Sequence, residues 1–317
     1  MKLLRMSDID VMMRELERLK LQNFDPLASI GGVIPSQLDF AETVMGSRMD
    51  TWQRAYMTNA PLQNRIGIAA SRQSGKSTVT ALFVAHCLLF IPNFMCLVAS
   101  RSLRQASHYL NKVRDAVLSI IPRDAMRQLN RLSMELPNGS SIVSIPCAQP
   151  DAGRGFSPHL VILDEAAFAP EELFRAITPS LAATQGALHM LSSPNGRQGY
   201  FFEAFEGDAA DVFWSQRVHW HDCPRITQEI ADMERIALGD LYFRQEFGAE
   251  FVSPLGAFIG HSAILQFEAG EDEDLSNLDI RDMEDILDNK FPTGDPDVED
   301  LREAMSRADR VTNLLYG

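Results

Sequence analysis

One short loop in this chain carries the residue types and spacing of a phosphate-binding site. Its residues are Ser71, Arg72, Gln73, Ser74, Gly75, Lys76, Ser77 and Thr78. Apolar runs at 66–70 and 79–90 flank it, which predicts the strand, turn and helix that a P-loop requires. Backbone N–H groups at such a turn and at the helix N-terminus favour negative charge. Lys76 adds a positive charge for the outer phosphates, and Ser77 adds a hydroxyl for Mg²⁺. We therefore expect the chain to bind a nucleoside triphosphate, although Ala70 stands where the usual pattern begins with glycine.

Two adjacent acids follow another apolar run, Leu160 to Leu163, 88 residues after Lys76. Asp164, at the tip of the predicted strand, is expected to hold Mg²⁺, directly or through water. Glu165 is expected to point the other way and to polarise the attacking water, which is the carboxylate that hydrolysis requires. The pair predicts hydrolysis rather than binding alone.

Two weaker patterns accompany these motifs. Ser192 and Ser193 end the next apolar strand, and small hydroxyls beside the phosphates can sense the γ-phosphate. Trp52 and Gln53 precede the P-loop strand. Gln can pair with the N6/N7 edge of adenine and Trp can stack on a base, whereas a tryptophan at a helix end is the simpler alternative.

The elements that must position these residues alternate along the chain. Apolar runs predict strands at 66–70, 95–100, 160–163, 187–192 and 213–220, helices at 76–90 and 103–120, and a hairpin of 131–136 with 141–146 around Asn138-Gly139. This alternation predicts an α/β fold, a three-layer P-loop NTPase domain of the RecA-like (ASCE) type with a mainly parallel sheet. In such sheets ligands bind at the carboxyl ends of the strands.

Composition divides the chain into an N-terminal helix and linker (1–35), a P-loop domain (36–255) and an acidic, partly helical tail (256–317). The net charge is −14, but residues 267–317 alone hold 16 acidic and 5 basic side chains, which leaves −3 for residues 1–266. Net charge therefore neither supports nor excludes a nucleic-acid partner. The longest apolar runs are too short for a membrane span.

Thiol and histidine patterns give little chemistry. The four cysteines are far apart and form no C-x-x-C pair, so we expect buried or incidental thiols in a reducing compartment. His219 and His221 could share one face of a strand as metal ligands. With no further His/Cys cluster nearby, a strand end before Pro224 is the better interpretation.

Taken in order, the motifs resemble the ATPase half of the large terminase subunit of tailed bacteriophages. The motifs that carry the resemblance are Trp52-Gln53, residues 71–78, Gly153-Arg154-Gly155, 163–166, 192–196 and 245–251, and they cover roughly residues 40–255. An arginine inside the P-loop is fairly distinctive of that family, so Ala70 ceases to be an anomaly.

The resemblance implies a role for each matching position. Gln53 would bind adenine, Lys76 and Ser77 would bind phosphate and Mg²⁺, and Asp164 would bind Mg²⁺. Glu165 would be the catalytic carboxylate, and Ser192 with Ser193 would couple hydrolysis to movement. Arg154 would be an arginine finger inserted into a neighbouring subunit, with Arg72 as the competing candidate acting in cis. A finger of this kind contributes ~10³–10⁵ in rate.

The family packages double-stranded viral DNA into proheads. The resemblance therefore implies a Mg²⁺-dependent ATPase motor in a homo-oligomeric ring, a pentamer, that acts in the cytoplasm of the infected host and at the prohead portal. Its expected partners are DNA, the portal and the small terminase subunit. The basic residues Arg101, Arg104, Lys112 and Arg114 are where related translocases touch DNA, although a solvated helix face explains them equally well.

The C-terminus departs from the family. Large terminases usually continue into a nuclease domain, whereas the 66 residues after Phe251 lack its strand pattern and length. We expect no nuclease activity from this chain, because it is either truncated or paired with a separate nuclease polypeptide, and we expect the acidic tail to be a docking segment. A helicase-like remodeller and an ATP-dependent assembly scaffold are the alternative functions.

Overall fold

The computed structural model describes Pro26 and residues 32–147 and 155–252. These residues belong to the first of two compact units, 1–252 and 253–317, into which the chain divides. The predicted N-terminal helix, the acidic tail and Arg154 lie outside the described residues. The domain boundaries proposed from composition stay predictions.

Eight strands form one sheet in the order β3-β4-β5-β2-β6-β7-β1-β8. The strands are β1 (Arg65–Ala70), β2 (Met95–Ser100), β3 (Gln128–Leu129), β4 (Ser133–Glu135), β5 (Ser141–Pro146), β6 (Leu160–Asp164), β7 (Ala187–Ser192) and β8 (Trp214–Val218). The six strands from β5 to β8 in this order pair in parallel. The β3-β4-β5 edge is antiparallel. The mainly parallel α/β sheet predicted from the sequence is confirmed.

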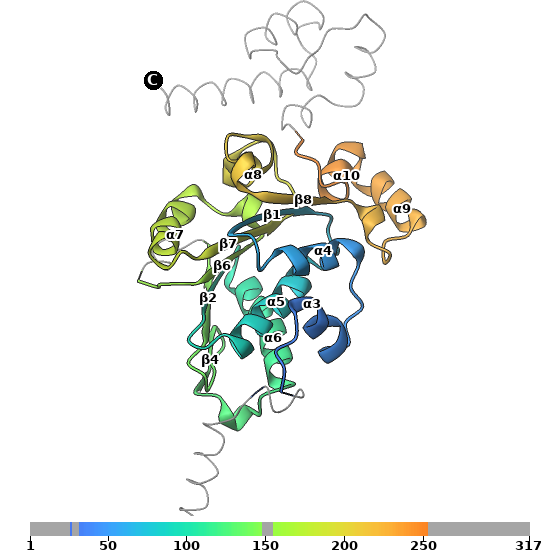
Figure 1. Ribbon diagram of the computed structural model, residues 1–317. Coiled ribbons are helices and arrows are strands. Elements are labelled where there is room, and N and C mark those ends of the chain that lie inside the picture. Colours follow the sequence, from blue (N-terminus) through green and yellow to red (C-terminus); the bar gives the residue numbers. More distant parts are fainter. Residues whose placement is uncertain (1–25, 27–31, 148–154, 253–317) are drawn as a thin grey trace, which may run out of the picture. The chain divides into compact units, whose positions relative to one another are not determined.

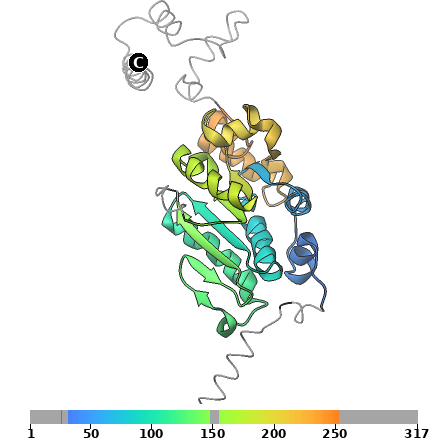
Figure 2. The same ribbon diagram turned by 60° about the vertical axis from the view of Figure 1, so that its left-hand side comes forward.

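Helices cover both faces of the sheet (Figures 1 and 2). They are α3 (Gln37–Asp39), α4 (Thr51–Asn59), α5 (Lys76–Phe90), α6 (Leu103–Leu118), α7 (Glu171–Thr184), α8 (Gly199–Glu206), α9 (Gln228–Leu238) and α10 (Asp240–Glu246). Short helical turns occur at Phe40–Val44, Arg123–Ala125, Ala166–Phe168, Ala210–Val212 and Trp220–Asp222. Alternate residues of the strands feed two apolar clusters. One cluster lies with α4, α5 and α6, and the other lies with α7 and α8.

The buried position of α5 explains its composition. Almost every residue of this helix is buried, as expected for a helix that is apolar all round. In contrast, α6 buries only one stripe, which includes Ala106, Tyr109, Leu110 and Val113. Ser102 caps α6 by accepting a hydrogen bond from the Gln105 N–H (3.2 Å), which supplies a partner for one of the unpaired donors of a helix start.

Most predicted elements have the expected bounds, with two differences. The helix predicted to reach residue 120 ends at Leu118, and the strand predicted to reach residue 220 ends at Val218. Trp220 instead begins a helical turn, whose start is capped by a hydrogen bond from the His219 N–H to the Asp222 carboxylate (2.9 Å). All four cysteines are buried and free, as predicted. No helix in the described part of the chain is long and apolar enough to cross a membrane.

Candidate active site

The predicted P-loop lies between the end of β1 and the first turn of α5. Gln73 (φ 58°) and Gly75 (φ 91°) both have left-handed backbone conformations, which bend the loop back under the helix start. The first turn of an α-helix has N–H groups without an intrahelical partner, and here it contains Lys76 and Ser77. Backbone donors and a lysine therefore converge on one place, as an anion site requires.

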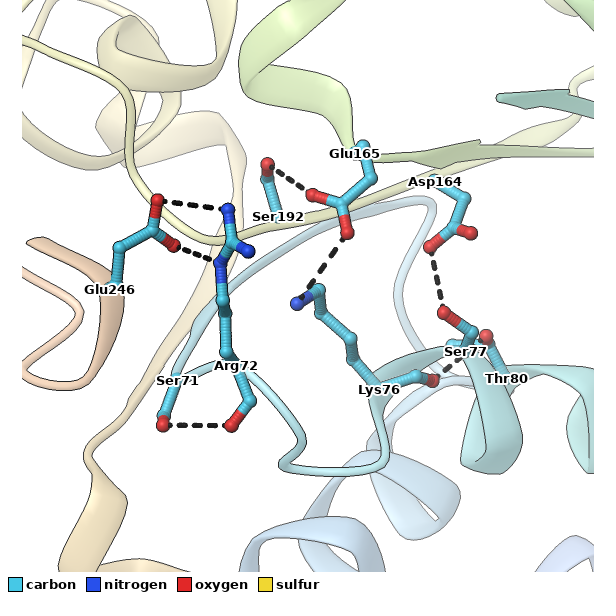
Figure 3. A network of polar contacts seen from close by, with 9 residues as sticks. All are labelled: Ser71, Arg72, Lys76, Ser77, Thr80, Asp164, Glu165, Ser192 and Glu246. Atoms are coloured by element: carbon cyan, nitrogen blue, oxygen red, sulfur yellow. Dashed lines mark hydrogen bonds and ion pairs between the residues drawn. The ribbon is translucent and has the colours of Figure 1, made fainter. Parts of the chain in front are cut away.

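Three strand ends meet at this place because β7 lies between β1 and β6. The Lys76 Nζ lies 3.7 Å from the Glu165 Oε1, and the Ser77 hydroxyl donates to the Asp164 Oδ1 at 3.0 Å. From β7, the Ser192 hydroxyl donates to the Glu165 Oε2 at 3.3 Å. Figure 3 shows both carboxylates directed at the P-loop. Ser193 is buried beside Ser192.

The direction of Glu165 differs from the expectation that its side chain points away from that of Asp164. Strand alternation would separate the two carboxylates. However, Glu165 has a left-handed conformation (φ 61°, ψ 46°), which ends the strand and turns the second carboxylate back toward Lys76. A non-glycine residue in this region is strained, and such strain clusters at functional sites.

Asp164 is almost fully buried, and burial together with the neighbouring Glu165 raises its pKa to about 6. The Ser77 hydrogen bond, Lys76 and Lys112 oppose this shift. A buried carboxylate next to a serine hydroxyl fits Mg²⁺, which prefers oxygen ligands and takes most of its shell from phosphates and water. No group of three or more His, Cys, Asp or Glu side chains suited to a metal occurs in the described ranges, and a Mg²⁺ site of this kind does not need one.

Arg72 of the P-loop forms a two-pronged ion pair with Glu246 of α10. Its Nε lies 2.6 Å from Oε2 and its Nη2 lies 3.1 Å from Oε1. The Arg72 N–H also donates to the Glu246 carbonyl at 2.8 Å. The hydrogen bond to the Glu246 carboxylate raises the pKa of Arg72. Arg72 is thus at the site and tied to α10, and its role as the arginine finger stays a prediction, as does that of Arg154.

Trp52 and Gln53 lie in the first turn of α4, away from where a base would stack. Trp52 is buried in the core, as in the simpler alternative. The Gln53 Oε1 accepts from the Asp50 N–H (2.9 Å) and its Nε2 donates to the Ser74 carbonyl (3.4 Å). Gln53 therefore supports the P-loop directly, and its adenine role stays a prediction.

Lys112 on α6 lies at the P-loop, not on an outward DNA-facing surface. Its Nζ donates to the Thr78 hydroxyl at 3.3 Å. Burial lowers the pKa of Lys112, and Asp164 opposes that shift. The other basic residues have different partners: Arg101 stacks over the Phe168 ring at 4.5 Å, and Arg114 donates to the Asn130 carbonyl.

Sequence reasoning missed two residues of the site. Glu246 pairs with Arg72 across 174 positions, and Arg225 donates to the Ser74 carbonyl across 151 positions. A lone arginine before a helix has no sequence signal, and Glu246 stood in a motif without an assigned role. The rings of His219 and His221 stack at 5.2 Å, and no metal cluster is found around them among the residues described.

Comparison with known proteins identifies the family. The family model described as "Terminase large subunit, T4likevirus-type, N-terminal" matches residues 68–258. The large terminase subunit of Thermus virus P23-45 is 27% identical over 228 residues, covering 57% of this chain and 44% of that protein. The large terminase subunit of Thermus phage G20c matches to the same extent. The chain thus spans less than half the length of the curated relatives that it matches.

Solved structures agree with this match. The ATPase domain of the Thermus phage P74-26 large terminase has a TM-score of 0.59 and 26% identity, covering 67% of this chain and 97% of that one. The large terminase of a thermophilic bacteriophage, solved in complex with ATP-γ-S, has a TM-score of 0.54 and 12% identity, covering 65% and 53%, which shows the shared fold alone. With its family match, its P-loop and its sheet order, the chain belongs to the T4likevirus-type terminase large subunits, and the match lies on their N-terminal domain.

Proposed function

We propose that this chain hydrolyses ATP with Mg²⁺ and uses the energy to translocate double-stranded DNA during viral genome packaging. The observation that carries the proposal is the meeting of Lys76 and Ser77 with Glu165 and Asp164 at adjoining strand ends. Binding alone would not need a second carboxylate directed at the P-loop. The thermophilic bacteriophage terminase that shares this fold forms complexes with ATP-γ-S and ADP, which supports an adenine nucleotide as the substrate.

The chain's own residues divide the work of hydrolysis. Backbone donors of the P-loop and Lys76 bind the phosphates and compensate their charge. Ser77 and Asp164 would hold Mg²⁺, which when bound neutralises charge that develops on the phosphate oxygens. Glu165 orients and polarises the attacking water, and Ser192 fixes one oxygen of its carboxylate. The hydrogen bond from β7 gives the coupling motif a direct connection to the catalytic carboxylate.

Two substitutions test the hydrolysis mechanism. Lys76→Ala should lose ATP turnover together with tight ATP binding. Glu165→Gln should keep ATP binding while its turnover falls by about 10²-fold or more, the usual contribution of a general base. Glu171→Gln, which removes an exposed carboxylate of an i,i+4 ion pair on α7, is the control and should change neither. Turnover at the wild-type rate in Glu165→Gln would show that Glu165 is not the base.

The ring, the cis or trans arginine and the DNA partner require assembled protein. If Arg154 acts in trans, mixing Arg154→Ala subunits with Glu165→Ala subunits should recover ATP turnover that neither variant has alone. If no mixture recovers turnover, Arg72 or a structural role is favoured. Stimulation of turnover by double-stranded DNA, measured with and without a nuclease partner, tests the motor function. A portal, a small terminase subunit and a prohead in the host cytoplasm complete the proposed setting.

A further inference from the structure

The carbonyl of Ser74, in the middle of the P-loop, accepts two side-chain hydrogen bonds. The Nη2 of Arg225 donates to it at 2.9 Å, and the Nε2 of Gln53 donates at 3.4 Å. Ser74 itself is fully buried. Arg225 comes from the segment between Trp220–Asp222 and α9, and Gln53 comes from α4. Two segments distant in sequence therefore hold one peptide group of the loop.

Fixing this carbonyl also fixes the next backbone donor. The Ser74 carbonyl and the Gly75 N–H belong to one planar trans peptide unit, so they point in opposite directions. With the carbonyl directed at Arg225 and Gln53, the Gly75 N–H is directed away from them. Glycine is required here, because a Cβ at residue 75 would lie 2.7 Å from the Gln53 Nε2 and 3.6 Å from the Arg225 Nη2.

Arg225 is itself held by a buried anion. Its Nη1 and Nη2 donate to the two carboxylate oxygens of Asp50 at 3.0 Å and 2.6 Å. The side chain of Asp50 is 8% exposed and that of Arg225 is 50% exposed. A paired guanidinium compensates a buried carboxylate with geometric specificity. The Asp50 N–H in turn donates to Gln53, so Asp50, Gln53, Arg225 and the Ser74 carbonyl form one connected network.

We propose that Arg225 is a positioning residue of the phosphate site, which holds the P-loop in its phosphate-binding shape through the Ser74 carbonyl and Asp50. This inference rests on the proposed function, since it needs the P-loop to bind nucleoside phosphates. Arg225 acts on the loop from its outer side, through backbone, and orients the donor of Gly75. Losing it leaves the chemical groups of the site in place and weakens their grip on the phosphates.

The test compares two ligands by titration calorimetry, Mg·ADP and inorganic pyrophosphate. Arg225→Met should bind both ligands about tenfold or more weaker, because a hydrogen bond from a charged donor is lost at the loop. Arg225→Lys should recover part of the affinity. The matched control is Arg244→Met, because Arg244 is also 50% exposed and pairs with Glu250 without touching the P-loop. It should bind both ligands like the wild type.

Several results would overturn the inference. Wild-type affinity in Arg225→Met would make Arg225 a surface ion pair only. Weakened ADP binding with unchanged pyrophosphate binding would place its role at the base or ribose. If Arg225→Met does not fold, Arg225→Lys and Asp50→Asn carry the same comparison, and wild-type affinity in both would refute the proposal. Failure of the wild-type chain to bind either ligand would instead refute the proposed function.

Discussion

Replacing Asp164 by asparagine is expected to stabilise the metal-free protein at neutral pH while destroying its Mg²⁺ site. Burial and Glu165 raise the pKa of Asp164 from 3.8 to about 6. A carboxyl group whose pKa is higher in the folded state binds its proton more tightly there, so the free energy of unfolding falls as pH rises through that range. Asparagine keeps the shape and an acceptor for the Ser77 hydroxyl, and it carries no charge.

The magnitude follows from the size of the shift. About two pKa units at 1.36 kcal/mol each correspond to about 3 kcal/mol of unfolding free energy lost above pH 7. By pH 5 the loss is roughly halved, because the folded protein is then mostly protonated at Asp164 while the unfolded chain is not. Asp164→Asn should therefore exceed the wild type by about 3 kcal/mol at pH 8 and by about half of that at pH 5.

The measurement is urea denaturation in EDTA at pH 5 and pH 8, read as midpoint and slope. Repeating it with Mg·ADP should stabilise the wild type and leave Asp164→Asn nearly unchanged, since only bound ligand shifts the folding equilibrium. A variant equal to or less stable than the wild type at pH 8 would refute the reasoning. So would a stability gap that does not narrow between pH 8 and pH 5.

Three further predictions concern the residues around the loop. Lys112→Met removes a charge that supports ionised Asp164, so ATP turnover at pH 6 relative to pH 8 should fall below the wild-type ratio; an unchanged ratio would contradict this. Gly75→Ala should abolish Mg·ADP binding through its contact with Gln53, whereas Gly239→Ala, which has a similar φ of 75° and open space, should lose only about 1–2 kcal/mol of stability and keep binding. The four buried cysteines should react with a thiol reagent only on unfolding, since burial raises the pKa of Cys87 to about 12; rapid labelling of the folded chain would count against this packing.

Local sequence patterns predicted most of the elements, because apolar strands and a buried helix have strong local signals. The strands at Met95–Ser100 and Ala187–Ser192 and the helix Lys76–Phe90 have the predicted bounds. The strand ending at Val218 was predicted too long, since apolar periodicity continued through Trp220 while a side-chain cap began a helical turn. The P-loop and the acid pair were likewise visible as residue types following predicted strands.

What the sequence by itself determined was which residues carry the chemistry, because a P-loop and a strand-end acid pair are local patterns. The tertiary structure alone decided how they combine. Strand order placed β7 between the P-loop strand and the acid strand, and a left-handed Glu165 turned both carboxylates to one side. It also brought Arg225 and Glu246 to the loop from more than 150 positions away. Such contacts depend on how whole elements pack, and no short segment of the chain contains that information.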